Sequence, residues 1–266
     1  MANSLRKTAA VILTMLMLVS VIPFQAFAAI KPGWHKEGKG WDGCYEYRYY
    51  ITSTTYATGW KKIGGAWYYF NESDGRMVRD RSDTGYEPGV VKDGGNFYYF
   101  AKNGKMMSSK WVETGSGWTY LTKSGAAIVT KGWHKINKKW YFFRPANQYT
   151  PSNCLLGMLL DYDGGMYYLD DNGSMHTGWL KNKKDYIYKY YASTDSVGKS
   201  YYNSSKKSYG TWFYFASSGK AVSGWKKYGG KWYYFYSSGY EMAYNTSIYD
   251  NGKQYNFDST GACTNP

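Results

Sequence analysis

The chain has 266 residues, of which 21% are aromatic, and its formal net charge is +14. Aliphatic residues are scarce, so a conventional core of leucine, isoleucine and valine is excluded at this length. The basic residues are spread along the chain and form no single stripe, which argues against nucleic acid as a partner and leaves other polyanions open.

The N-terminal residues 1–28 have the pattern of a secretory signal peptide. Arg6 and Lys7 form a positive region, an apolar run follows over residues 8–21, and residues 26–28 supply the small side chains that a signal peptidase requires. The apolar run is shorter than the ~20 residues of a membrane span, so cleavage after Ala28 is favoured over a membrane anchor. The sequence therefore predicts a secreted protein of residues 29–266, with a net charge of 14 − 2 = +12.

Tryptophan spacing predicts an internal repeat. Twelve tryptophans occur, and ten of them form pairs whose members are seven residues apart, whereas random placement would give roughly half a pair. The pairs are Trp34/Trp41, Trp60/Trp67, Trp111/Trp118, Trp133/Trp140 and Trp225/Trp232.

Each pair flanks a turn. Gly64-Gly65 lies between Trp60 and Trp67, and two glycines between short aromatic runs predict a β-hairpin, because a type I′ turn needs positive φ at both turn positions. The same signal recurs at Gly94-Gly95 and Gly229-Gly230, with Asn137-Lys138 and Gly115-Ser116 as variants. A polar loop that ends in glycine and a hydrophobic residue, such as Gly75 and Met77, follows each aromatic strand.

Degenerate copies extend the repeat to about ten hairpins. Their expected second-strand anchors are Trp41, Trp67, Phe97, Trp118, Trp140, Met166, Tyr186, Trp212, Trp232 and Tyr255. A single hairpin is not stable in water, so neighbouring units must bury each other's faces. The predicted fold is all-β, an elongated solenoid of stacked β-hairpin repeats over residues 29–266.

Two stretches interrupt the periodicity, and we expect residues 144–158 and 189–210 to be loops. The cysteines Cys44, Cys154 and Cys263 are too few and too widely spaced for a disulfide framework, although one bridge stays open. No spacing of metal ligands is present, and no metal or cofactor is expected.

The alternation of side chains divides each hairpin into two faces. With a turn at Gly64-Gly65, one face holds Trp60, Lys62, Trp67 and Tyr69, and the other holds Lys61, Ile63, Tyr68 and Phe70. Two interpretations of the tryptophan face compete: its rings form the core of the array, or they form an open box. An aromatic box suits a quaternary ammonium ion, at roughly 0.5–2 kcal/mol per ring, and flat ring faces also suit sugars.

The repeat resembles the cell-wall-binding repeats of choline-binding proteins. The best copies are Gly59-Trp60, followed by Trp67-Tyr68-Tyr69-Phe70 and Gly75-Arg76-Met77, and Gly224-Trp225, followed by Trp232-Tyr233-Tyr234-Phe235. The resemblance covers residues 33–261. It implies non-covalent attachment to the bacterial cell wall, through cages between successive repeats that hold choline on teichoic or lipoteichoic acid.

Carried over residue by residue, the resemblance predicts cages built from two tryptophans and a tyrosine of the next repeat. These are Trp34, Trp41 and Tyr69; Trp60, Trp67 and Tyr99; and Trp133, Trp140 and Tyr168. Phenylalanine replaces the tyrosine in two further sets, which are Trp111 and Trp118 with Phe142, and Trp225 and Trp232 with Phe257. Two repeats lack both tryptophans, Val90 with Phe97 and Leu159 with Met166, and are interpreted as spacers.

No catalytic constellation is visible in the sequence. His35, His134 and His176 lie in different repeats, and no motif of a nucleophile with its base occurs. The expected protein is a non-catalytic, secreted binding protein of the cell surface or cell wall. A glucan or host-glycan ligand, or a purely structural role for the aromatics, remains an alternative, because no residue distinguishes choline from a sugar. The oligomeric state stays open.

Overall fold

A computed structural model describes residues 29–81, 89–182, 187–200 and 211–266. The expected signal peptide, residues 1–28, lies outside the described residues, and so do the expected anchor Tyr186 and residues 201–210. Strands and turns make up the described part of the chain, and no helix in it has the length and apolar character of a transmembrane span.

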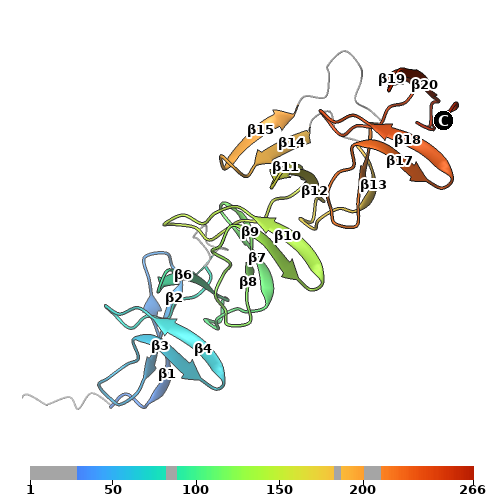
Figure 1. Cartoon of the computed structure of the whole chain (residues 1–266). Coiled ribbons are helices and arrows are strands. Elements are labelled where there is room, and N and C mark those ends of the chain that lie inside the picture. Colours follow the sequence, from blue (N-terminus) through green and yellow to red (C-terminus); the bar gives the residue numbers. More distant parts are fainter. Residues whose placement is uncertain (1–28, 82–88, 183–186, 201–210) are drawn as a thin grey trace, which may run out of the picture. The chain divides into compact units, whose positions relative to one another are not determined.

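The strands form consecutive antiparallel hairpins (Figure 1). In chain order the first ten strands are β1 (Gly33–Lys39), β2 (Tyr45–Tyr50), β3 (Gly59–Ile63), β4 (Ala66–Phe70), β5 (Gly89–Asp93), β6 (Asn96–Phe100), β7 (Lys110–Thr114), β8 (Gly117–Leu121), β9 (Gly132–Ile136) and β10 (Lys139–Phe143). The next ten are β11 (Met158–Tyr162), β12 (Gly165–Leu169), β13 (Gly178–Lys181), β14 (Ile187–Tyr191), β15 (Ser196–Ser200), β16 (Trp212–Phe215), β17 (Gly224–Tyr228), β18 (Lys231–Phe235), β19 (Thr246–Asp250) and β20 (Lys253–Phe257). The prediction of an all-β array of hairpin repeats is confirmed.

The described residues fall into two compact units. The first holds the residues up to Lys61 together with Tyr69–Met77, and the second holds Lys62–Tyr68 together with Val78–Pro266.

The hairpin turns explain the glycine pairs of the sequence. Gly229 and Gly230 have φ values of 56° and 79°, which fits the type I′ turn that matches the twist of two paired strands. Asn137 and Lys138 adopt the same conformation with φ values of 47° and 69°, as predicted for a variant of this turn. Gly115-Ser116 also joins two strands, but neither residue has positive φ, so this turn is of another type.

The first hairpin departs from the predicted register. Trp34 on β1 lies opposite Tyr49 on β2, and Lys36 lies opposite Tyr47. Trp41 was expected on the second strand, but it lies in the connection between β1 and β2 and is 81% exposed. The seven-residue spacing misled the prediction here because the connection is longer than two residues, so Tyr47 takes the place that a tryptophan has in other hairpins.

A second correction concerns the interruption after β13. Strand β13 pairs with β16, so that Trp179 lies opposite Tyr214 and Lys181 lies opposite Trp212. Trp212 is therefore a second-strand anchor, as expected, but the first strand of its hairpin lies before residues 189–210. Between these two strands the chain forms a further hairpin, β14–β15, and β14 joins β11 in parallel, which gives the sheet order β12-β11-β14-β15. Residues 189–200 were expected to be a loop, but they belong mostly to this inserted hairpin.

The inserted hairpin is fastened at its turn. The Asp195 carboxylate accepts a hydrogen bond from the Tyr190 hydroxyl at 2.6 Å and pairs with the Lys131 ammonium, which also donates to the carbonyl of Ala192. Both partners hold the pKa of Asp195 below its usual value, with Lys131 as the larger cause. The side chains of Tyr190 and Ala192 are buried against Phe142, Leu160 and neighbouring residues.

A backbone ladder links each hairpin to the one before it. A residue of the loop after a second strand donates its N–H to the carbonyl of the second-strand anchor of the preceding hairpin, at 2.7–2.8 Å, and in six of the eight cases below this donor lies two residues after a glycine. The donor and acceptor pairs are Met77 and Tyr47, Met106 and Trp67, Ala127 and Phe97, Cys154 and Trp118, Met175 and Trp140, Ala221 and Met166, Met242 and Trp212, and Cys263 and Trp232. The same residues bridge to the last residue of their own second strand, as Met175 does to Leu169. The hydrophobic residue of the Gly-x-Met motif thus marks the point where one repeat locks onto its neighbour.

Aromatic residues of successive hairpins form the core, in place of the scarce aliphatics. In the second unit Trp111 and Tyr120 pack on a cluster that includes Tyr141 and Phe143 of the following hairpin. Further clusters of this kind surround Phe142, Phe213 and Phe257. The predicted packing face is confirmed in the best copy of the repeat, because Tyr68 and Phe70 are buried.

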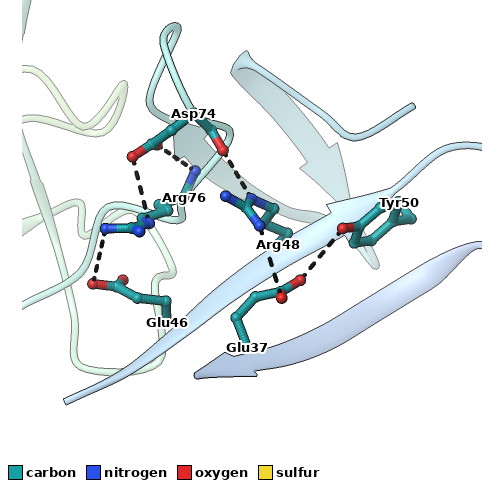
Figure 2. Close-up of polar contacts among 6 residues, drawn as sticks. All are labelled: Glu37, Glu46, Arg48, Tyr50, Asp74 and Arg76. Atoms are coloured by element: carbon teal, nitrogen blue, oxygen red, sulfur yellow. Dashed lines mark hydrogen bonds and ion pairs between the residues drawn. The ribbon is translucent and has the colours of Figure 1, made fainter. Parts of the chain in front are cut away.

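The first unit carries a network of charged residues (Figure 2). Arg48 pairs with Glu37 at 3.7 Å and donates from Nε to the carbonyl of Asp74 at 2.8 Å. Arg76 pairs with the Asp74 carboxylate at 3.4 Å and with the buried Glu46 at 3.9 Å. These contacts hold the loop after β4 against β2, which positions Met77 of that loop for its bond to Tyr47.

Candidate ligand-binding site

Each tryptophan-bearing hairpin places three large side chains on one face. The first-strand tryptophan meets an aromatic ring directly across the hairpin, two residues after the second-strand anchor. Ring centroids are 5.3 Å apart for Trp60 and Tyr69, Trp111 and Tyr120, Trp133 and Phe142, and Trp225 and Tyr234, and 5.1 Å apart for Trp179 and Tyr214. The rings are steeply inclined, as aromatic pairs prefer.

In the second unit the following hairpin adds a fourth ring, which packs against the first-strand tryptophan. This ring comes from the position directly after the second-strand anchor. The centroid distances are 4.9 Å for Trp111 and Tyr141, 5.1 Å for Trp133 and Tyr167, 5.2 Å for Trp179 and Tyr233, and 4.6 Å for Trp225 and Tyr255. The first-strand tryptophan is therefore wedged between two hairpins and is partly buried.

The second-strand tryptophans are the open walls of this arrangement. The exposed fractions are 42% for Trp67, 37% for Trp118, 41% for Trp140 and 37% for Trp232. Their backbone carbonyls are fixed by the ladder described above, so an exposed ring is held on a rigid strand. A partly buried ring beside an exposed one forms a corner that a cation or a sugar face can enter.

In the predicted cage of Trp133 and Trp140, the third wall is displaced by one residue. Tyr168 was assigned to Trp133 and Trp140, but it packs among Met166, Phe213 and Phe215, and its neighbour Tyr167 faces Trp133. Side chains alternate along a strand, so a shift of one residue exchanges the two faces. The prediction took the correct strand but the wrong face.

The other two predicted tyrosines have contacts within their own parts of the chain, and their place in a cage stays a prediction. Tyr69 belongs to the hairpin of Trp60, which it meets across the strands, and Tyr99 is buried with Val112 and Leu121 of the next hairpin. In the sets with phenylalanine, Phe142 is fully buried against its own Trp133, whereas Tyr141 faces Trp111.

Phe257 is different from Phe142, because its ring centroid lies 5.7 Å from that of the tryptophan to which it was assigned, Trp225. The expected anchor Tyr255 is shifted by one residue, because Tyr249 lies opposite Gln254 in the last hairpin.

The first predicted cage includes a tryptophan that lies outside the strands. The Trp34 ring centroid lies 5.3 Å from that of Tyr49 and 5.8 Å from that of Phe70 within the first unit. Trp41 lies on the β1–β2 connection, and the cage of Trp34, Trp41 and Tyr69 stays a prediction.

One aromatic set was missed by the sequence reasoning. Trp179 and Trp212 lie on paired strands with centroids 6.1 Å apart, and Tyr214 and Tyr233 complete the set. The two tryptophans are 33 residues apart in the chain because the β14–β15 insertion separates them, so the seven-residue period could not find them. The Gly178-Trp179 dipeptide was the available signal.

The two hairpins interpreted as spacers have buried anchors. Phe97 and Met166 each pack in a core cluster, as does Leu159. Their placement agrees with the interpretation of these repeats as spacers.

The remaining reactive side chains have structural surroundings. His176 contacts the Asp170 carboxylate at 2.9 Å and the carbonyl of Trp179 at 3.2 Å, and His134 contacts the carbonyl of Thr130 at 3.1 Å. The three cysteines are free thiols, and burial raises the pKa of Cys154 to about 12. Within the described ranges, no group of three or more histidine, cysteine or acidic side chains is arranged to hold a metal ion.

Several segments of the chain match known families of repeats. Residues 57–111 match the model of a choline-binding repeat, and residues 131–145, 206–221 and 223–240 match that of a putative cell wall binding repeat. The matched segments are thus of the choline-binding and cell wall binding repeat type. The hairpin of Trp60 lies in the choline-binding repeat match, and the hairpins of Trp133 and Trp225 lie in the putative cell wall binding repeat matches.

Solved structures of choline-binding proteins have the same fold. CbpJ from Streptococcus pneumoniae TIGR4 aligns with a TM-score of 0.56 at 23% identity, over 88% of this chain and 71% of that one. Choline binding protein F from Streptococcus pneumoniae aligns with a TM-score of 0.52 at 24% identity, over 83% of this chain and 62% of that one. A comparison with curated protein sequences gives no match.

Proposed function

We propose that this protein is a secreted, non-catalytic binding protein that attaches non-covalently to the bacterial cell wall, by holding choline of teichoic or lipoteichoic acid in its aromatic cages. The observation that carries the proposal is the corner between a partly buried first-strand tryptophan and an exposed second-strand tryptophan. Packing accounts for the first ring but leaves the second ring facing solvent.

Four cages lie in the second unit, and the second-strand tryptophan is exposed in three of them, whereas Trp212 is partly buried. Each consists of two tryptophans, the ring across from the first of them and the ring from the next hairpin. They are Trp111, Trp118, Tyr120 and Tyr141; Trp133, Trp140, Phe142 and Tyr167; Trp179, Trp212, Tyr214 and Tyr233; and Trp225, Trp232, Tyr234 and Tyr255.

Several weak cages suit a repetitive polymer. A single cage of millimolar affinity contributes only about 4 kcal/mol, which is too little for stable attachment. Cages that engage one polymer together multiply the avidity by roughly 10² to 10⁴ without new contacts. The net charge of +12 for residues 29–266 adds long-range attraction to the phosphates of such a polymer, screened beyond ~10 Å at moderate salt.

A glucan is the second candidate ligand, because exposed tryptophan faces also stack on sugar rings. The two ligands differ in charge, and this difference gives the test.

The protein is applied to a choline-agarose column, and elution is measured with free choline and with glucan oligomers. We expect retention and specific release by choline. The variant Trp118→Ala/Trp140→Ala removes two exposed cage walls and should elute at a clearly lower choline concentration. Tyr149→Ala removes a more exposed aromatic ring, in the loop after β10, and should elute like the unchanged protein.

Release by glucan oligomers and not by choline would favour the glycan ligand. The double variant could instead be less stable and yet be retained on the column as before. That result would show that the two tryptophan rings serve only in packing, and it would overturn the proposal.

A further inference from the structure

A lysine stands over the second-strand aromatic ring in five of the described hairpins. It comes from the position directly across the two strands, and its ammonium lies within the ~6 Å at which a cation is attracted to a ring face. The distances from Nζ to the ring centroid are 5.9 Å for Lys62 and Trp67, 5.5 Å for Lys92 and Phe97, 5.8 Å for Lys135 and Trp140, 5.6 Å for Lys181 and Trp212, and 5.7 Å for Lys227 and Trp232.

The hairpin β7–β8 breaks this pattern. Glu113 lies directly opposite Trp118, on the face that also holds Trp111 and Tyr120. Its side chain is exposed, and it makes no ion pair with any residue in the described part of the chain. Among the hairpins that the structure describes, this is the one acidic residue opposite a second-strand aromatic ring, since Asp161 faces Met166.

The exchange reverses the charge beside an otherwise similar cage. An ammonium ligand that lies on Trp140 must approach the like charge of Lys135 and displace it from the ring. At Trp118 the same ligand meets an opposite charge within the ~5 Å that separates facing β-carbons of paired strands. Reversing the sign of one of two unit charges at such a distance on a protein surface changes the dissociation constant of the ligand by about a factor of ten.

We propose that Glu113 selects for ligands of net positive charge, and that the cage of Trp111 and Trp118 binds choline more tightly than the lysine-bearing cages do. This inference rests on the proposed function, because it assumes that the cages hold an ammonium group. It assigns Glu113 a role in specificity that the aromatic pattern alone does not reveal.

The test is a site-resolved titration. The protein is labelled with 5-fluorotryptophan, the ¹⁹F resonances of Trp118 and Trp140 are assigned with Trp118→Phe and Trp140→Phe, and choline is added at low salt. We expect the Trp118 resonance to titrate at an about threefold to tenfold lower choline concentration than the Trp140 resonance. Glu113→Gln should remove most of this difference, and Glu113→Lys should reverse it.

Two controls separate charge from shape. The matched variant Lys135→Glu should tighten choline binding at Trp140 by about threefold to tenfold without moving the Trp118 curve. The neutral isostere 3,3-dimethyl-1-butanol has the shape of choline without its charge, and it should bind Trp118 equally in the unchanged protein and in Glu113→Gln.

The outcomes distinguish this inference from the proposed function. Choline titration of both resonances with no effect of the Glu113 variants would overturn the inference and leave the proposed function intact. The absence of any choline-dependent shift would overturn both. Circular dichroism spectra of the variants establish that Glu113→Gln and Glu113→Lys are folded, which their exposed position favours.

Discussion

The two tryptophans of a hairpin differ in what surrounds them. Trp133 contacts Phe142 across its own hairpin and Tyr167 of the next one, so removal of its ring opens a gap between two repeats. Trp140 lies opposite Lys135 and keeps 41% of its surface exposed. The same residue type therefore contributes to packing at one position and faces solvent at the other.

This difference predicts separate effects on stability and on binding. Trp133→Ala should lower the free energy of unfolding by about 3 kcal/mol, because it leaves a cavity in a packed aromatic cluster. Trp140→Ala should change it by about 0.5 kcal/mol or less, as exposed substitutions do. Urea denaturation measures both, and equilibrium titration with choline should show weaker binding in both variants. Equal destabilisation by the two substitutions would contradict the assignment of Trp140 as an open wall.

At the scale of the elements, the β14–β15 hairpin is an addition to an array that is otherwise regular. Its hydrogen bonds to β11 extend a sheet in parallel, and Tyr190 enters the core beneath β11. Its turn is held by Asp195, whose pKa is lowered by Lys131 and Tyr190. A carboxylate with a depressed pKa stabilises the folded state at a pH above its usual value of ~3.9, and this contribution is lost as the pH falls through the lower folded value.

We therefore expect the amide protons of β14 and β15 to be better protected at pH 6 than at pH 3, after correction for intrinsic exchange. Asp195→Asn should remove the pH dependence in these two strands only. The amides of β17 and β18, which lie outside this contact, serve as the internal reference. An unchanged pH dependence in Asp195→Asn would assign the effect to other carboxylates.

The elements also show what the sequence could predict and what it could not. Hairpins with two-residue turns were recognisable because Gly229-Gly230 and Asn137-Lys138 carry the turn chemistry within the sequence itself. The pairing of β13 with β16 was not, because the residues that pair are separated by an insertion. The third ring was misplaced by one residue in the sets of Trp111 and Trp133, since the rotation from one hairpin to the next is a tertiary property that strand alternation does not contain. Trp41 shows the opposite error: it follows Trp34 by seven residues, as in the other pairs, but no two-residue turn lies between the two tryptophans.

At the scale of the molecule, the cages are coupled to folding. Each cage of the second unit takes rings from two successive hairpins, so a ligand that binds there bridges two repeats. A ligand that binds only the folded state raises its stability by about 2.7 kcal/mol per site at 100 times the dissociation constant.

Choline should therefore raise the midpoint of thermal unfolding, and the rise should grow with the logarithm of its concentration above the dissociation constant. Differential scanning calorimetry measures the shift, with tetramethylammonium as a smaller cation and sodium chloride at equal ionic strength as controls. The absence of a shift at high millimolar choline would contradict cages that span two hairpins.

The order of donors and acceptors in the backbone ladder bears on the order in which the repeats can fold. Every donor, from Met77 to Cys263, comes later in the chain than the carbonyl it satisfies, by one repeat. A chain that emerges N-terminus first during synthesis would therefore present each acceptor before its donor, and the backbone bonds of each repeat would be completed only when the next repeat has formed. Folding could then advance one hairpin at a time without waiting for the whole chain. At β13 it would pause until β16 had emerged, so the insertion delays closure of the Trp179 hairpin.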